Sequence, residues 1–507
     1  MHKLRNVYNF TRANRQFIRF ASISPVEVNT REETLKSWRE IPGPSTLPLL
    51  GQIHHFFPGG SLANPKESLT DLLYKQYGPI VKLDGHFGAP TLILLYDAEA
   101  SAQILRSENW MPLRPGFQSL EYFRKKVLRN KDDDPDEPTG LISDQGEIWK
   151  KFRSTVNPIM LQPKTIKLYT NSLNEVAEDM VKRLRSKRNE KYMIEGRFDE
   201  EMNLWALESI GVVALGGRIN CLDPNLPKNS NARKLIQVVH DIFTVADSLD
   251  FKPSMWRYIS TPTFKRAMKH YNDQVELSKH FIQKAMEDFK TKEKTSNEEK
   301  GVLEKLLEID EKIAVIMASD MLFAGVDTAA NTMIATLYFL ANNPEKQNKL
   351  REEVLSDNEK RPYLKACLKE SMRIMPVVAG NMRSTSKEYN IMGYKIPKNM
   401  YVSFAHQSLS LMDEHYPRPK EYIPERWITN KEDPLYHGNA HPFAYSPFGF
   451  GVRSCIGRRI AELETEIFLT KVIENFQLEW FGPPLQVKQT SLNYITGPFN
   501  FIFKDVK

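Results

Sequence analysis

The sequence contains very little cysteine. Only Cys221, Cys367 and Cys455 occur in 507 residues, so there is no disulfide framework and a reducing compartment fits the composition. No second cysteine or histidine stands at ligand spacing from Cys455, which argues against a zinc site there. We expect Cys221 and Cys367 to be buried as small apolar side chains.

Acidic residues are absent from the first 26 positions, which also lack a long apolar run. A membrane anchor needs about 20 consecutive apolar residues, and the basic residues here interrupt every apolar run, namely Lys3, Arg5, Arg12, Arg15 and Arg19. On a helix, three arginines share one face and apolar residues cover the other. The segment therefore predicts a mitochondrial transit peptide over residues 1–26. A disordered basic tail is the alternative.

Internal repeats and low-complexity linkers are also missing. The stretch Ile-Pro-Gly-Pro at residues 41–44 marks the expected start of a compact body, since proline cannot continue a helix. We therefore expect a connection over residues 27–40 and a single domain over residues 41–507. The leader holds five of the seven excess positive charges, so the body is nearly neutral and we expect no nucleic-acid partner.

The body has apolar residues at helical spacing in many places. We predict helices over residues 149–160, 173–184, 203–213, 313–340 and 363–375. Strand-like runs are few, and we predict strands over residues 81–83, 91–96 and 401–404. The charged segment 290–300 predicts a solvated connection. The expected fold is mainly α-helical with small β-sheets.

Cys455 is surrounded by a motif of fixed positions. Phe448, Gly451, Arg453, Cys455 and Gly457 match Phe-x-x-Gly-x-Arg-x-Cys-x-Gly. Glycines permit a tight loop whose amide N–H groups favour a thiolate, and the arginine can pair with a carboxylate. The motif resembles the haem-binding loop of the cytochromes P450, and the likeness runs from about residue 41 to the C-terminus. It implies haem b with Cys455 as the axial iron ligand, held between a long central helix and the cysteine loop.

A polar interruption, Ala-Gly-Val-Asp-Thr at residues 324–328, lies inside the apolar run 313–340. Burying an unpaired carboxylate is costly, so Asp327 needs either a partner, such as a cap or a lysine, or a chemical role. The stretch resembles the oxygen-activating part of the central P450 helix, in which a glycine and a threonine open the helix. The resemblance implies that Asp327 and Thr328 deliver protons through ordered water.

Two further patterns resemble P450 elements that hold the cofactor. Glu370 and Arg373 stand three residues apart, which alone is an ordinary pair on a helix surface. With the following Pro-Glu-Arg-Trp at residues 424–427, they resemble the Glu-x-x-Arg and Pro-x-Arg elements, which implies a structural ion-pair network of Glu370, Arg373 and Arg426.

The haem propionates should meet arginine side chains, because a guanidinium suits a carboxylate. Trp149 and Arg153 match the Trp-x-x-x-Arg of the family, and Arg383 stands where another propionate-binding arginine is expected. Together with Arg453, these residues form the predicted propionate site.

Pairs of basic residues flank the motif regions. Lys365 and Lys369 lie four apart on one predicted helix, which is otherwise typical of a solvated face. They resemble the lysines with which mitochondrial P450s bind an acidic ferredoxin, and the double arginine Arg458 and Arg459 resembles the same group. The resemblance implies electrons from NADPH through a ferredoxin reductase and ferredoxin, at the matrix side of the inner mitochondrial membrane with peripheral membrane association.

The stretches at residues 110–116, 156–158 and 205–209 look most like insect members of the mitochondrial group, some of which oxidise foreign compounds and others ecdysteroid precursors. The expected activity is a monooxygenase that hydroxylates an apolar small molecule with O2. Expected pocket residues are Phe323, Ala324, Val377, Val378 and Thr496. A haem isomerase or dehydratase is the alternative that Asp327 and Thr328 argue against, and a non-catalytic haem sensor would leave the lysine pair without a purpose.

Overall fold

The computed structural model describes residues 35–47, 51–63, 68–85, 89–130, 132, 134–194, 196–291, 299–356 and 358–506. The predicted transit peptide lies outside the described residues. Residues 36–40, which the sequence analysis places in the connection, form a strand and a 3₁₀ turn. The physical reason is that Trp38 packs against a buried apolar cluster that includes Ile93 and Tyr389.

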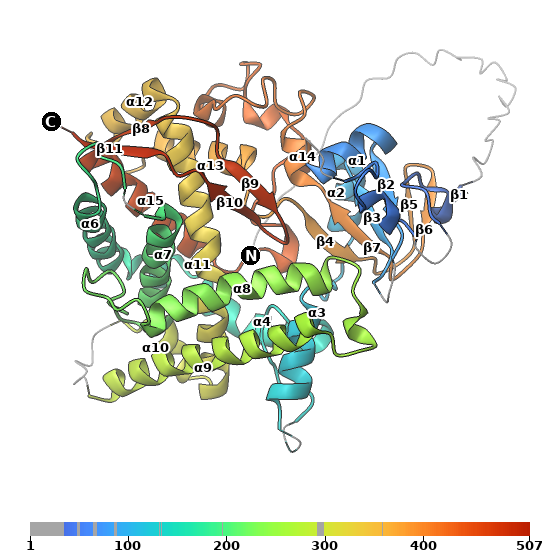
Figure 1. Ribbon diagram of the computed structural model, residues 1–507, viewed down its shortest axis with the longest axis horizontal. Coiled ribbons are helices and arrows are strands. Elements are labelled where there is room, and N and C mark those ends of the chain that lie inside the picture. The colour runs from blue at the N-terminus through green and yellow to red at the C-terminus, as the bar shows by residue number, and fades with distance from the viewer. Residues whose placement is uncertain are drawn as a thin grey trace, which may run out of the picture.

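Helices make up the larger part of the molecule (Figure 1). They are α1 Leu69–Tyr77, α2 Ala98–Arg106, α3 Gln118–Tyr122, α4 Gly146–Met160, α5 Pro163–Lys167, α6 Thr170–Ser186, α7 Phe198–Leu215, α8 Asn231–Asp250, α9 Pro262–Thr291, α10 Val302–Leu307, α11 Glu311–Ala341, α12 Pro344–Val354, α13 Pro362–Ile374, α14 His406–Ser410 and α15 Arg458–Asn475. A π-helical segment, Phe123–Leu128, follows α3.

Side-chain caps fix where several of these helices begin. Ser68, Asp97, Ser230 and Asp310 each accept a hydrogen bond from the backbone N–H three residues on, at the starts of α1, α2, α8 and α11. These caps satisfy amide groups that have no partner inside the helix.

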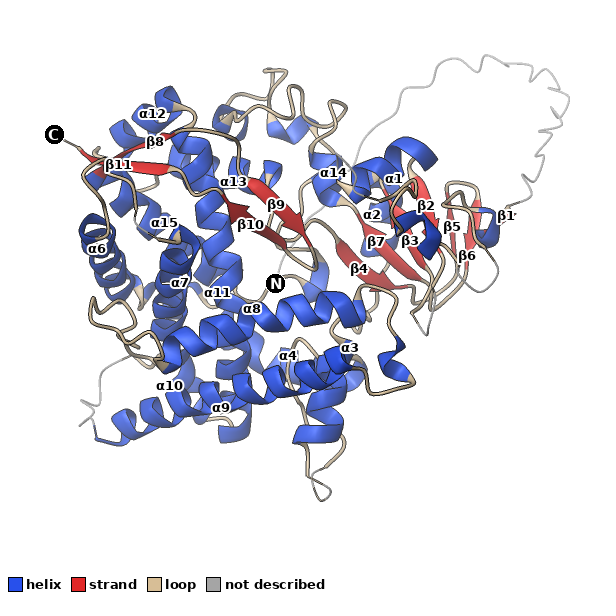
Figure 2. Ribbon diagram, in the orientation of Figure 1, coloured by secondary structure: helices blue, strands red, loops and turns tan. Residues whose placement is uncertain are grey.

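Short strands form four small sheets (Figure 2). The strands are β1 Lys36–Ser37, β2 Ile80–Leu83, β3 Leu92–Leu95, β4 Asn381–Ser384, β5 Tyr389–Ile391, β6 Tyr394–Ile396, β7 Tyr401–Phe404, β8 Phe476–Trp480, β9 Gln486–Gln489, β10 Asn493–Gly497 and β11 Phe501–Asp505. The largest sheet has the order β2-β3-β7-β4, in which only the β3–β7 pair is parallel. The other sheets are β1-β6-β5, β10-β9 and β11-β8.

α11 runs through the middle of the helical part and carries the core (Figure 1). It is apolar on nearly all sides, as is α7, and both are almost completely buried. α7, α8, α9, α13 and α15 pack around α11. The β2-β3-β7-β4 and β1-β6-β5 sheets gather at one side of the molecule, away from α6 and α7 (Figure 2).

All five predicted helices and all three predicted strands are confirmed, although the true elements differ by a few residues at their ends. The expected fold, mainly α-helical with small β-sheets, is confirmed, but the sequence did not predict the further strands β1, β4–β6 and β8–β11. They span only two to five residues, which is too short for the alternation of apolar and polar residues to stand out. The predicted connection over residues 290–300 begins later than expected, since α9 continues to Thr291, and residues 292–298 lie outside the described residues.

Candidate active site

Cys455 lies in a tight loop between the 3₁₀ turn Gly451–Arg453 and the first residue of α15. Gly449 and Gly451 have φ angles of +73° and +68°, in the left-handed region that favours glycine. The Cys455 amide N–H donates to the Phe448 carbonyl oxygen at 2.8 Å and closes the loop. The sulfur is therefore held just ahead of the N-terminus of α15, where unpaired amides favour a negative charge.

The surroundings of the Cys455 thiol act on its pKa in opposite directions. Burial raises the pKa, while the Gly457 amide and the Arg153, Arg114 and Arg458 guanidinium groups lower it. The residue nevertheless keeps accessible surface, so the protein encloses the thiol on most sides and leaves it open on one. Such a thiol can bind a metal ion, which deprotonates it outright.

The other two cysteines, Cys221 and Cys367, are buried, as predicted. The described residues contain no group of three or more His, Cys, Asp or Glu side chains that could hold a metal ion. Within that part of the chain, Cys455 is therefore a single sulfur ligand and not part of a multi-residue metal site.

The central helix α11 has an accessible stretch in the middle of an otherwise buried surface. Ala324 is exposed although Phe323 and Val326 beside it are buried, so this side of the helix is accessible. Thr328 lies one turn further on the same side, and its hydroxyl donates to the Ala324 carbonyl oxygen at 2.7 Å.

The resemblance implied that α11 opens at Gly325 and Thr328, and this expectation is wrong, because α11 is one continuous α-helix from Glu311 to Ala341. Gly325 has another explanation. A Cβ atom there would lie 2.6 Å from Cγ1 of Ile210 on α7, so the glycine lets α7 and α11 pack closely.

Asp327 is buried, with one satisfied and one unsatisfied carboxylate oxygen. Its Oδ2 accepts a hydrogen bond from the Tyr494 hydroxyl on β10 and lies 3.8 Å from Nδ1 of His240 on α8. Its Oδ1 is buried without a hydrogen-bond partner. Among the described residues, neither a lysine nor a helix cap holds this carboxylate, and its hydrogen-bond donor is Tyr494.

Four arginine side chains lie close to one another near Cys455. Burial and then the like charges of Arg383 and Arg153 lower the pKa of Arg114 to about 10. Burial and the same two charges, with Arg114, lower the pKa of Arg453 to about 8. Burial also lowers the pKa of Arg153 and Arg383. This concentration of positive charge favours the binding of an anionic group.

The protein already uses two of these arginines internally. Arg453 donates to the Pro112 carbonyl oxygen at 3.1 Å and to Oε1 of Gln145 at 2.7 Å. The Nε of Arg383 lies 2.6 Å from Oε1 of Glu108. Both predicted propionate ligands therefore also hold the cysteine loop against its neighbours.

The other two arginines, Arg153 and Arg114, have hydrogen-bond donors without a partner among the described residues. Arg153 donates to the Ser454 carbonyl oxygen at 2.9 Å, but its Nε is buried without a partner. Across the described ranges, the Arg114 guanidinium makes no hydrogen bond or ion pair. The sequence analysis missed Arg114 as a site residue, although it lies in the stretch 110–116 that was noted only for its likeness to insect relatives.

This donor set fits a haem. A shielded thiol can bind the iron, and the unpaired donors of Arg114 and Arg153 can bind propionates. The predicted Trp149 is buried on α4, and its ring lies under the Arg453 guanidinium. Gly457 stands where a Cβ would touch the sulfur, 3.9 Å away. Iron bound to thiolate is the cofactor chemistry that activates O2.

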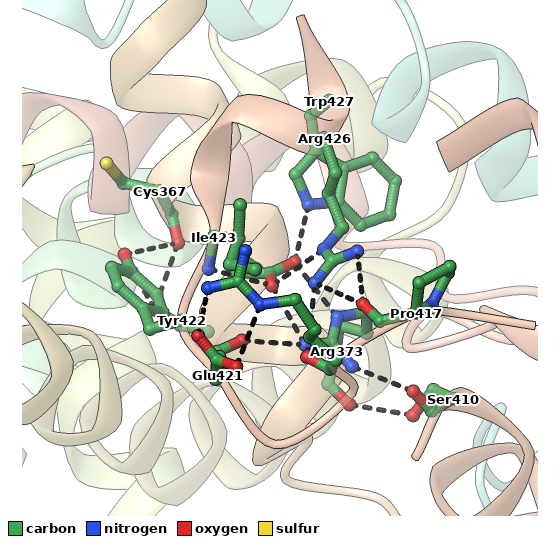
Figure 3. A network of polar contacts seen from close by, with 12 residues as sticks. Cys367, Arg373, Ser410, Pro417, Glu421, Tyr422, Ile423, Arg426 and Trp427 are labelled. Carbon is green, nitrogen blue, oxygen red and sulfur yellow. Dashed lines mark hydrogen bonds and ion pairs between the residues drawn. The ribbon is translucent and has the colours of Figure 1, made fainter. Parts of the chain in front are cut away.

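The predicted network of Glu370, Arg373 and Arg426 is present and completely buried (Figure 3). Glu370 Oε1 lies 2.8 Å from Arg373 Nη2 and 2.9 Å from Arg426 Nε. The Trp427 indole N–H donates to Glu370 Oε2 at 2.9 Å. The remaining guanidinium N–H groups reach carbonyl oxygens, among them that of Ser410 at 2.8 Å.

The predicted docking residues lie on α13 and at the start of α15. Lys365 is exposed, and its Nζ lies 3.8 Å from Oε2 of Glu466. Arg458 is also exposed, and its Nε lies 2.8 Å from Oε1 of Glu462. Lys369 is half-buried, and its Nζ lies 5.6 Å from the Trp427 ring centre. The Arg458 guanidinium lies 5.3 Å from the ring centre of Phe448, in the cysteine loop, and Arg459 beside it is exposed.

Comparison with known proteins agrees with this geometry. The family model described as Cytochrome P450 matches residues 41–501, and the chain belongs to that family. It is 38% identical to Cytochrome P450 CYP12A2 of Musca domestica, with 94% of this chain and 92% of the relative aligned. It is 36% identical to Probable cytochrome P450 12a5, mitochondrial, of Drosophila melanogaster, with 96% of this chain and 94% of the relative aligned.

A solved structure, titled Crystal structure of cytochrome P450DA heme domain, has the same fold, with a TM-score of 0.71 over 92% of this chain and 97% of that chain at 19% identity. The protein is therefore a cytochrome P450 monooxygenase, an oxidoreductase with haem b as its cofactor.

Proposed function

We propose that this enzyme hydroxylates an apolar small molecule, either a foreign compound or a steroid, inside mitochondria. Electrons come from NADPH through a ferredoxin reductase and a ferredoxin. The mitochondrial assignment is supported by the leader and by relatives such as the Drosophila melanogaster protein, whose name includes the word mitochondrial.

The proposal that ferredoxin is the electron donor rests on basic residues of α13 and of the start of α15, which follows the cysteine loop. The Arg458 guanidinium lies over Phe448 of the cysteine loop, and Lys369 lies over Trp427, which donates to Glu370 of the buried ion-pair network. Lys365 and Arg459 are exposed close by in the sequence. A cationic surface next to the cofactor attracts an acidic protein and speeds its association.

Aromatic side chains around Phe323 support the proposal that the substrate is apolar. Phe117, Phe243 and Phe323 come from three separate parts of the chain, and the Phe243 and Phe323 rings stack with centres 5.0 Å apart. Phe323 is next to the exposed Ala324 of α11. Ala324, Val377, Val378 and Thr496 complete the proposed pocket, and none of these four is fully buried.

Within the proposed reaction, the chain binds and orients the substrate and supplies protons. Trp149, Arg153, Arg383 and Arg453, with Arg114, hold the propionates and the cysteine loop. The Thr328 hydroxyl donates to the Ala324 carbonyl oxygen in this structure and can turn from it toward the accessible side of α11. Asp327 would pass protons toward it, and the Asp327 Oδ1 atom is buried without a hydrogen-bond partner among the described residues.

Peripheral contact with the inner membrane is supported by exposed apolar residues between α8 and α9. This segment exposes Phe251, Met255, Tyr258 and Ile259, and a group of exposed apolar side chains of this kind is typical of a membrane or partner contact.

The proposed function is tested by reconstitution. The purified enzyme should give the carbon monoxide difference spectrum of a thiolate-bound haem and should turn over with NADPH, ferredoxin reductase and ferredoxin. A panel of ecdysteroids and foreign compounds, including 7-ethoxycoumarin, would identify the substrate class. Reduction by a microsomal P450 reductase but not by ferredoxin would contradict the proposed electron donor.

A further inference from the structure

Asp327 is in reach of one titratable side chain that also has contact with solvent. The Nδ1 atom of His240 lies 3.8 Å from Asp327 Oδ2, and the His240 side chain is 45% exposed while that of Asp327 is 1% exposed. A distance of 3.8 Å is longer than a hydrogen bond, and a rotation of the imidazole that shortens it by about 1 Å would form one. The pair therefore connects a buried carboxylate to the molecular surface.

Neighbouring contacts hold the two groups in this arrangement. The rings of His240 and Tyr494 meet edge to face with centres 4.8 Å apart. Asn331 donates to the Asp327 carbonyl oxygen at 2.8 Å and accepts from the Ile495 amide at 2.9 Å. These bonds fix β10 against α11, so Tyr494 keeps its place on the carboxylate.

The charged and titratable groups around His240 show which of them can exchange a proton near neutral pH. The Asp327 carboxylate beside it raises the His240 pKa above its ordinary value, Asp241 raises it further, and burial and Arg197 oppose this. Burial and Asp327 raise the Tyr494 pKa far above the physiological range, so the tyrosine stays protonated. Of these two neighbours of Asp327, the histidine is therefore the one that can exchange protons with solvent.

We propose that His240 is a positioning residue through which protons pass from solvent to Asp327, with Tyr494 orienting the carboxylate for the exchange. The imidazolium gives its Nδ1 proton to Asp327 Oδ2 and keeps the proton on Nε2. The bare Nδ1 then turns toward solvent and takes a proton from hydronium or a buffer acid, which restores the imidazolium. The other carboxylate oxygen of Asp327, Oδ1, has no hydrogen-bond partner among the described residues. Thr328 is the next residue in the chain. This inference depends on the monooxygenase reaction of the family and not on the identity of the electron donor or substrate.

The first test measures the protonation of His240 in the haem-containing enzyme. Diethyl pyrocarbonate modifies only neutral imidazole, so the rate of modification against pH, followed by mass spectrometry of the peptides, gives the pKa of each histidine. Asp327→Asn should lower the His240 midpoint, because the carboxylate that raises the His240 pKa is lost. His280, an exposed histidine on α9, is the internal control, and its rate of modification should be the same in both proteins.

Tyr494→Phe provides a second variant in case Asp327→Asn does not fold. It removes the competing donor from the carboxylate and should raise the His240 midpoint, because the negative charge is then less stabilised by the tyrosine. An unchanged His240 midpoint in either folded variant would overturn the proposal.

The second test separates proton delivery from a structural role, with 7-ethoxycoumarin as the probe. His240→Gln should lose product per NADPH consumed and release more hydrogen peroxide, most strongly below the His240 midpoint where wild type carries the imidazolium. Turnover driven by cumene hydroperoxide, which needs no proton delivery to reduced oxygen, should match wild type. His280→Gln should behave as wild type in both assays. Equal product per NADPH for His240→Gln and wild type at all pH values, or an equal loss in the peroxide-driven assay, would refute the proposed role.

Discussion

The guanidinium of Arg453 lies 3.7 Å from the ring centre of Trp149. This contact joins the cysteine loop to α4, because Arg453 stands two residues before the ligand and Trp149 lies in the first turns of the helix. The same guanidinium donates to the Asp144 carbonyl oxygen at 3.1 Å and to Gln145 Oε1 at 2.7 Å. The planar side chain of Arg453 thus ties the cysteine loop to α4 and to the segment before it.

Arg453→Lys should therefore lower haem content even though it keeps the charge. Lysine cannot stack on the ring or reach several acceptors at once. Haem per protein, measured as the pyridine haemochrome, should fall in this variant. Arg257→Lys is the matched control, since Arg257 lies 4.8 Å from the centre of Trp256 away from the haem site. Full haem content in Arg453→Lys would contradict the role given to this contact.

Glu370→Gln should destabilise the fold strongly. The change leaves Arg373 and Arg426 buried with no carboxylate, and breaking a buried ion pair in this way costs about 3–5 kcal/mol. The measurements are the free energy of unfolding and the retention of haem on heating. Glu388→Gln removes an exposed partner of Lys395 and should change neither by much. A similar effect of both substitutions would show that the network is not needed for stability.

The sequence allowed much of the network of Glu370, Arg373 and Arg426 to be predicted, but little of the polar group around Asp327. Glu370 and Arg373 are three residues apart, so their pairing follows from helix geometry. Arg426 comes from a distant segment, and its place was inferred only from the resemblance.

No comparable signal pointed to His240 or Tyr494. Tyr494 lies 167 residues from Asp327 in the chain and on a strand that was not predicted. The packing of α8 and β10 against α11 brings these residues together, and long-range packing is not visible in one sequence without a family motif. Arg114 was missed for the same reason, because the charge cluster appears only when the cysteine loop folds next to it.

Gly325→Ala tests the close packing of α7 and α11. The added Cβ would meet Ile210, and forcing extra volume into a packed core costs about 1–3 kcal/mol. The midpoint of thermal unfolding should fall, and the fall caused by Gly325→Ala should be smaller in an Ile210→Ala background, which lacks the Cγ1 atom that clashes. If Gly325→Ala lowers the midpoint equally in both backgrounds, the contact with Ile210 is not the cause.

Lys369→Glu should slow reduction of the haem by ferredoxin. The substitution reverses a charge of the proposed docking surface on α13 and weakens the attraction of an acidic partner. Stopped-flow reduction rates should fall, and added salt should slow wild type more than the variant, because salt screens the attraction that the variant has lost. Lys279→Glu changes a lysine on α9 that pairs with Glu276 and serves as control. Equal rates for Lys369→Glu and Lys279→Glu would exclude this docking surface.

The stability of Asp250→Asn relative to wild type should increase as pH rises from about 4 to about 6. Asp250 ends α8, and its Oδ2 accepts from the Ser119 hydroxyl at 2.6 Å. Burial raises the pKa of Asp250 to about 6, although Ser119 and Arg257 oppose this. The unfolded chain has a carboxyl pKa of about 4, so between about pH 4 and pH 6 the folded protein binds more protons than the unfolded one.

Wild type therefore loses the stabilising contribution of Asp250 as pH rises through this window, whereas asparagine does not titrate. The difference in thermal midpoint, variant minus wild type, should increase from about pH 4 to about pH 6 and then stay level. Groups that titrate in both proteins cancel in this difference, so its slope reports Asp250 alone. A difference that is constant or decreases over the window would show that the buried carboxyl group of Asp250 is not protonated in the folded enzyme.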